Sequence, residues 1–165
     1  MAARSGGEIL VAGLVAQGAT HLYGVPGESY LPVLDALVDV RERLRFVVCR
    51  QEGGAAFMAE ATGKLTGRPG VAIVTRGPGA TNAAIGVHVA AQDSTPMVLL
   101  VGQGGADMVD REAVQEIDQV GTIGRLAKWS AEPTSADEVP GVMAEATSQA
   151  LAGRRGAPAA PGRPH

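Results

Sequence analysis

The sequence predicts an α/β domain, a doubly wound parallel sheet with helices on both faces. Short apolar segments of strand length alternate with longer segments in which apolar residues recur at helical spacing. The apolar segments contain few polar residues, which is typical of strands buried on both faces of a parallel sheet. Strands and helices in alternation require crossover connections, and 165 residues leave room for one domain of this kind.

The expected elements follow one another closely along the chain. Ser5 and Glu8 have the spacing of a capping box, so a first helix is expected to begin there and to end near Gly18. Strands are expected at 20–25, 44–49, 71–75 and 96–101, and helices at 31–38, 51–66, 80–91 and 136–152, with short helical pieces at 113–118 and 123–126. The domain is therefore expected to span residues 1–152, followed by a disordered Gly/Pro/Arg tail at 153–165.

Composition excludes several classes of function. The formal net charge is −3 and no basic stripe is present, which argues against a nucleic-acid partner. No apolar stretch approaches the roughly 20 residues that cross a bilayer, and residues 1–7 lack the apolar core of a signal peptide. The single cysteine, Cys49, excludes an internal disulfide and a cysteine-built metal site and is expected to be a buried core thiol. These features predict a cytoplasmic domain without a membrane partner.

Three candidate ligand loops lie where predicted strands end, at 24–29, 50–54 and 76–82. In open parallel sheets ligands bind at the carboxyl ends of the strands. Each loop also has an ordinary explanation, because glycine-rich turns are common and Glu52 could simply favour the beginning of a helix. Three glycine-rich loops at one sheet edge, one of them carrying a carboxylate, together favour a binding site. The small residues at 53–56 would let a ligand or another protein surface approach Glu52 closely.

The common nucleotide-binding motifs are not met. The sequence GPGATN at 77–82 resembles a dinucleotide fingerprint, but Asn82 stands where the third glycine belongs. The sequence GKL at 63–65 lacks the upstream glycine and the Ser/Thr of a P-loop. A nucleotide-binding α/β protein is therefore a weak alternative.

Taken together, the motifs resemble the N-terminal, pyrimidine-binding domain of acetolactate-synthase-like thiamine-diphosphate enzymes. The matching blocks are YGVPG at 23–27, RQEGGAAFMA at 50–59, TGKLTGRPGV at 62–71, TRGPGATN at 75–82, DSTPM at 93–97 and AVQEID at 113–118. The resemblance extends from about residue 7 to about residue 155, with the order and spacing of the blocks preserved. It implies a doubly wound pyrimidine-binding domain that acts within a homo-oligomer on a 2-oxo acid, by decarboxylation or carboligation.

The resemblance assigns roles to particular residues. Glu52 matches the family's glutamate, which donates a hydrogen bond to the aminopyrimidine ring and so helps to deprotonate the thiazolium carbon. The cofactor site would be completed by Val25, Pro26, Gly27, Thr75, Pro78, Gly79 and Asn82. Gln115 would approach the substrate. Flavin (FAD) binds to some relatives, but nothing in this sequence supports it here.

Two positions depart from the family pattern. Many relatives have histidine where Gln51 stands, and a glutamine cannot titrate; many also have phenylalanine where Val114 stands. Because of both departures, the resemblance does not identify the substrate.

The sequence also lacks the motif with which the family binds the diphosphate of the cofactor. Relatives hold the diphosphate and its Mg²⁺ in a second domain that carries a Gly-Asp-Gly motif, and no such motif occurs in the 165 residues. Relatives continue into a last apolar strand, whereas APAAP follows here at 157–161, and proline does not suit a central strand. The last strand is therefore expected to be missing, as in a truncated, frame-shifted or fragmentary chain that is inactive alone. The competing hypothesis is a non-catalytic homologue or interaction module.

Overall fold

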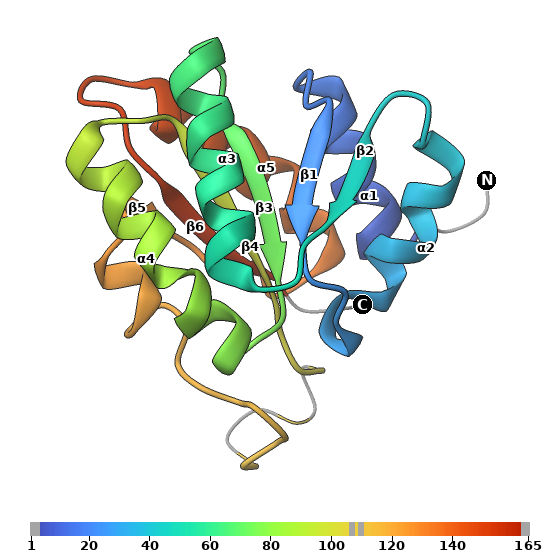
Figure 1. The fold of residues 1–165 in the computed structure, drawn as a ribbon. Coiled ribbons are helices and arrows are strands. Elements are labelled where there is room, and N and C mark those ends of the chain that lie inside the picture. The colour runs from blue at the N-terminus through green and yellow to red at the C-terminus, as the bar shows by residue number, and fades with distance from the viewer. Residues whose placement is uncertain (1–3, 106–107, 109–110, 163–165) are drawn as a thin grey trace.

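A computed structural model of the chain describes residues 4–105, 108 and 111–162, without the side chains of 161 and 162. Over this part of the chain a single sheet of six parallel strands has the order β2-β1-β3-β4-β6-β5 (Figure 1). The strands are β1 (His21–Gly24), β2 (Arg45–Val48), β3 (Gly70–Val74), β4 (Met97–Gly102), β5 (Trp129–Ser130) and β6 (Pro158–Gly162). The predicted fold class is confirmed.

Helices cover both faces of the sheet. They are α1 (Gly6–Ala16), α2 (Leu31–Val40), α3 (Glu52–Thr66), α4 (Pro78–Asp93) and α5 (Val139–Leu151), with single 3-10 turns η1 (Glu28–Tyr30), η3 (Ile123–Arg125) and η4 (Ala136–Glu138). Helices α3 and α4 lie together on one face, and α1, α2 and α5 pack on the other (Figure 1). Among the described residues, no helix combines the length and the apolar character needed to cross a membrane.

The core forms two layers because successive strand side chains point to opposite faces. In β3, Val71 and Ile73 pack under α1, α2 and α5, whereas Ala72 and Val74 pack under α3 and α4. All five residues of β3 and all six of β4 are buried, as expected for the central strands of a parallel sheet.

Glycine and alanine let α3 approach its neighbours closely. A Cβ added at Gly86 of α4 would lie 2.4 Å from the Cβ of Ala56, and one added at Gly63 would lie 2.0 Å from the Pro96 carbonyl oxygen. Helix α3 begins where the Gln51 side chain accepts a hydrogen bond from the Gly54 amide, and it ends at Gly67 in the left-handed conformation. These close contacts fix the beginning of α3, and Glu52 with it, relative to α4.

The expectation of a missing last strand and a disordered tail was wrong for the described part of 153–165. Residues 158–162 form β6, which pairs with β4 on one side and with β5 on the other. The Ala157 and Ala159 carbonyls accept hydrogen bonds from Lys128 and Ala131. Residues 163–165 of the predicted tail lie outside the described residues.

Proline is tolerated in β6 because of where its two prolines stand. Pro158 is the first residue of the strand, a position that needs no ladder donor. Along a strand, the N–H and C=O groups of every second residue point toward the same neighbouring strand. Those of Ala159 point toward β5, so the position of the N–H that Pro161 lacks also faces the β5 side. Strand β5 pairs only with Pro158 and Ala159, so it has already ended at that level.

Three further expectations need correction. Residues 113–118 contain a turn at 114–115 and no helical piece. Strand β2 is an edge strand with two exposed and two half-buried residues, not a strand buried on both faces. Cys49, which follows it, is half-buried, and its thiol lies 3.7 Å from the Met58 sulfur. The capping box of Ser5 and Glu8 is confirmed.

Candidate functional site

The three glycine-rich loops meet at the carboxyl edge of the sheet, because β1, β2 and β3 are neighbours there. A Cβ added at Gly27 would lie 2.8 Å from the Cβ of Thr75, and one added at Gly79 would lie 2.7 Å from its Cγ2. The same added atom at Gly79 would lie 3.7 Å from Oε1 of Glu52. The lack of side chains at Gly27 and Gly79 thus lets these loops pack closely on Thr75. The meeting point of the loops beside Glu52, at the first turns of α3 and α4, is called the crevice below.

Glu52 is the first residue of α3, and its half-buried carboxylate faces α4. Its Oε2 accepts a hydrogen bond of 3.0 Å from Nδ2 of Asn82, one turn into α4. Among the described residues, none forms a hydrogen bond with its Oε1, the oxygen on the Gly79 side. The structure therefore brings Glu52, Gly79 and Asn82 together, although their roles toward a cofactor stay predictions.

The loop at 25–27 is attached to the rest of the site through Tyr30, a residue that the sequence did not single out. The Tyr30 hydroxyl donates a hydrogen bond to the Val25 carbonyl, and the ring is 3% exposed. Burial, and secondarily the nearby negative charge of Glu52, raise the pKa of Tyr30 well above its ordinary value. Tyr30 therefore stays neutral at physiological pH and holds the loop from its buried side.

Thr75 follows the end of β3, and it links two of the three loops. Its hydroxyl shares a hydrogen bond of 2.7 Å with the hydroxyl of Ser29. Close backbone approach also matters here, because a Cβ added at Gly102 would lie 2.3 Å from Oγ of Ser29. Pro26 and Pro78 are exposed at the mouth of the crevice, where a ligand could reach them.

The two positions that depart from the family pattern have distinct surroundings. Gln51 is exposed and caps α3 with its side chain, so its contribution here is to the helix that carries Glu52. Val114 is 69% exposed in the segment that follows β4. The next residue, Gln115, has a positive φ of 63° and packs its backbone against Gly77. The structure thus places the Gln115 backbone beside the α4 loop. In the described part of the chain, no hydrogen bond joins its exposed side chain to Glu52.

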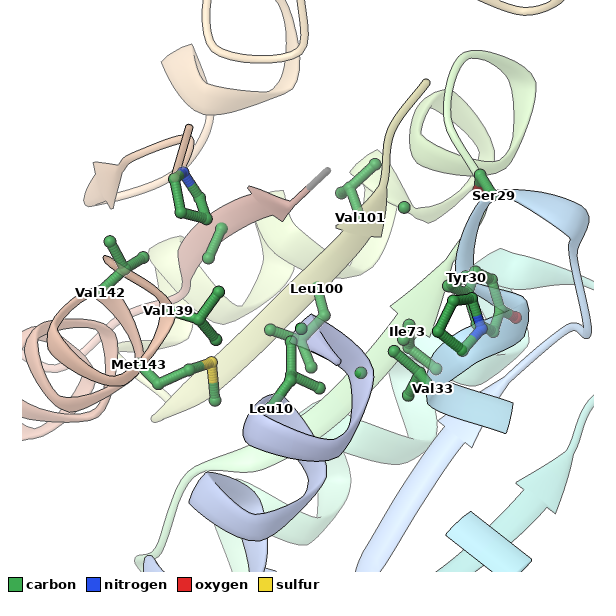
Figure 2. Close-up of a pocket in the computed structure, with 16 residues that line it drawn as sticks. Leu10, Ser29, Tyr30, Val33, Ile73, Leu100, Val101, Val139, Val142 and Met143 are labelled. Atoms are coloured by element: carbon green, nitrogen blue, oxygen red, sulfur yellow. The ribbon is translucent and has the colours of Figure 1, made fainter. Parts of the chain in front are cut away.

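An apolar cavity of about 50 Å³ lies on the other side of Tyr30, between α1, α2 and α5 (Figure 2). Its walls include Leu10, Val33, Leu100 and Met143, and it shares Ser29 and Tyr30 with the loops described above. Glu52, Gly79 and Asn82 do not line it. The cavity and the crevice are therefore separate spaces on opposite faces of the sheet edge.

The side chains around Glu52 do not form a metal-binding cluster within the described part of the chain. The crevice offers one carboxylate oxygen, backbone from glycine-rich loops and no excess of anionic ligands. Among residues 4–105, 108 and 111–162, no three His, Cys, Asp or Glu side chains gather closely enough to hold a metal. The Glu52 carboxylate is a hydrogen-bonding group of the kind that the edge of an aminopyrimidine can contact.

The fold is an α/β domain whose three glycine-rich loops gather at the carboxyl edge of a parallel sheet. The family described as "Thiamine pyrophosphate enzyme, N-terminal TPP binding domain" matches residues 4–122. The chain belongs to this family.

Individual relatives agree with the family assignment. The chain is 40% identical over 152 residues to the acetolactate synthase isozyme 2 large subunit of Escherichia coli, covering 92% of this chain and 27% of that protein. It is 40% identical over 153 residues to the acetolactate synthase of Bacillus subtilis, with 92% and 26% covered. It is also 39% identical over 153 residues to the mitochondrial acetolactate synthase catalytic subunit of Aspergillus candidus, with 93% and 22% covered. The chain spans about a quarter of the length of these relatives.

Proposed function

We propose that this domain binds the aminopyrimidine of thiamine diphosphate and presents Glu52 to it, in an enzyme that decarboxylates or joins 2-oxo acids. The observation that carries the proposal is the crevice in which Oε1 of Glu52 faces Gly79 while Asn82 holds Oε2. When bound, the cofactor supplies the carbanion chemistry. The relatives named acetolactate synthase support pyruvate as the first substrate to test.

Each residue of the crevice has a distinct role in the proposal. Glu52 hydrogen-bonds the ring through Oε1, and Asn82 fixes the rotation of that carboxyl group. Gly27 and Gly79 pack closely on Thr75, which holds their backbone at the edge where the ring would lie. Val25, Pro26 and Pro78 complete the wall, and Gln115 approaches the substrate.

A second protein surface would complete the site. Glu52 is only half-buried in this domain, and a hydrogen-bond-donating carboxyl group is favoured where water is excluded. The outer face of α3 and α4 exposes Phe57 (40%) and Ile85 (55%) on the Glu52 side, and Leu65 (87%) near the other end of α3. We propose that this α3–α4 face binds a diphosphate-binding domain, which brings the Mg²⁺ and excludes water from the crevice.

The chain alone is then expected to be inactive, because its 165 residues contain no Gly-Asp-Gly motif. The alternative, a non-catalytic homologue, was motivated partly by the expected loss of the last strand. Because strand β6 is present, the expected loss of the last strand no longer supports this alternative. The alternative now rests on the absent motif alone.

Calorimetry with thiamine diphosphate and Mg²⁺ tests the proposal. The chain alone is expected to bind weakly or not at all, and to bind once the diphosphate-binding domain of an acetolactate synthase relative is supplied. The mixture should then release CO₂ from pyruvate. Absence of binding in the mixture would favour the non-catalytic homologue, and tight binding by the chain alone would contradict the need for a second domain.

One pair of substitutions tests the proposed α3–α4 face. Leu65→Glu should abolish the gain in binding without changing the stability of the domain, because Leu65 is 87% exposed. Leu151→Glu is the matched control, since Leu151 is also exposed but lies on α5, which packs on the opposite face. Equal effects of the two substitutions would contradict the assignment of this face.

A further inference from the structure

We infer that Arg76 is a positioning residue that holds the turn carrying Gln115 against the cofactor crevice. Among the described residues, Arg76 is the one basic side chain that is buried, with 9% of the residue exposed. It directly precedes the Gly-Pro-Gly turn into α4. A guanidinium in this position needs partners, because a buried charge without them is costly.

Its two partners belong to different segments. Nε donates a hydrogen bond of 2.6 Å to the carbonyl of Val114, and an Nη2 bond of 3.2 Å reaches Oε1 of Glu28. The Glu28 side chain is 67% exposed, so this ion pair is partly screened by water. The bond to Val114 is the shorter of the two and fixes the backbone one residue before Gln115.

A second contact holds the same turn in the same place. Gly77 has a φ of 60°, and a Cβ added there would lie 2.4 Å from the Gln115 carbonyl oxygen. Gln115 itself has a φ of 63° and Glu112 a φ of 54°, conformations that non-glycine residues adopt only when their surroundings impose them. Arg76 and Gly77 provide such surroundings, one through a hydrogen bond and the other through close packing.

Arg76 affects the position of the Gln115 turn relative to Glu52. Residues 76–79 contact the Gln115 turn at one end and Glu52 at the other. A planar, forked guanidinium can hold a carbonyl and a carboxylate at once, which a lysine ammonium does with much less directional control. Arg76 therefore sets where Gln115 stands relative to Glu52. Any role of Gln115 toward a substrate rests on the proposed function, whereas the attachment of the turn does not.

Hydrogen exchange in the full chain tests the attachment directly. The amides of Ala113 and Glu116 are hydrogen-bonded within the turn, to the Glu116 carboxylate and the Ala113 carbonyl. Arg76→Met should speed their exchange by about tenfold or more, the loss expected from one charge-assisted hydrogen bond. Arg76→Lys should lie between wild type and Arg76→Met. The matched control is Arg154→Met, which removes an arginine bonded to Ser94 and Gln92 far from this turn.

Three outcomes overturn the inference. They are unchanged exchange at Ala113 and Glu116, a change no larger than in Arg154→Met, and equal acceleration throughout the sheet, which would show general destabilisation. If Arg76→Met does not fold, Arg76→Lys decides by the same criteria.

In the assembled enzyme, Arg76→Lys should raise the KM for the 2-oxo acid about tenfold while changing kcat less. Faster exchange of the turn with an unchanged KM would leave the attachment intact and contradict only the role of Gln115. Absence of thiamine diphosphate binding by the wild-type assembly would contradict the proposed function instead.

Discussion

Gly79→Ala should destabilise the domain by about 1–3 kcal/mol, because the added methyl group would overlap the side chain of Thr75. The added Cβ would lie 2.7 Å from Cγ2 of Thr75, closer than van der Waals contact allows. Thr75 cannot simply turn away, because its hydroxyl is bonded to Ser29 at 2.7 Å, and losing that bond costs about 1 kcal/mol. The better helix propensity of alanine offsets about 1 kcal/mol of the total.

Gly54→Ala is the matched control for this substitution. Gly54 also lies in the first turn of a helix, but a Cβ added there meets nothing within 4 Å. The control should therefore stabilise the domain by about 0.5–1 kcal/mol. Urea unfolding followed by circular dichroism gives both free energies of unfolding. Equal stabilities for the two variants would refute the close packing of Gly79 against Thr75.

Two other predictions concern Tyr30 and the last strand. The folded-state pKa of Tyr30 is raised above the ordinary tyrosine value of about 10, so its contribution to stability is complete below pH 10 and is lost as the pH rises further. Tyr30→Phe should abolish this part of the loss of stability at alkaline pH. The same dependence of the unfolding free energy on pH in wild type and Tyr30→Phe, measured from pH 8 to 11, would contradict this prediction. A chain ending at Gly153 should lose its cooperative unfolding transition, because β6 contributes the buried Ala159 and Ala160 and pairs with β4; an unchanged circular dichroism melt would mean that the tail is dispensable.

The sequence predicted the central part of the fold because several local signals agree there. Strands β3 and β4 are short, wholly apolar and followed by glycine turns, and a strand buried on both faces has that pattern. The first helix was indicated by its capping box. The candidate loops were predicted to share an edge because the carboxyl ends of parallel strands lie together.

The C-terminal part could not be predicted in the same way. The rule against proline in central strands assumes that a neighbouring strand accompanies the whole strand on both sides. Strand β5 is only two residues long, so β6 has no neighbour on that side beside Pro161. The pairing of β6 with β5 also joins segments that are far apart in the sequence. Such pairing leaves no local pattern that composition or periodicity could detect.

The supporting residues of the site were missed for a related reason. Tyr30 and Arg76 hold the site through hydrogen bonds to the backbone carbonyls of Val25 and Val114, and backbone carbonyls carry no signature in the sequence. The exposed edge position of β2, and with it the half-buried state of Cys49, likewise depends on strand order. An apolar segment alone does not show which strand lies outermost.

The most direct test of the account measures deuterium exchange of the thiazolium C2 proton of thiamine diphosphate in the assembled enzyme, with Glu52 and with Glu52→Gln. Glutamine is nearly isosteric and can keep a polar contact with Asn82, but it cannot exchange a proton with the ring in the way a carboxyl group does. We expect the exchange rate to fall by at least about 100-fold, the lower range for loss of general acid–base assistance. An exchange rate in the Glu52→Gln enzyme equal to that of the wild type would contradict the assignment of Glu52 as the activating carboxyl group.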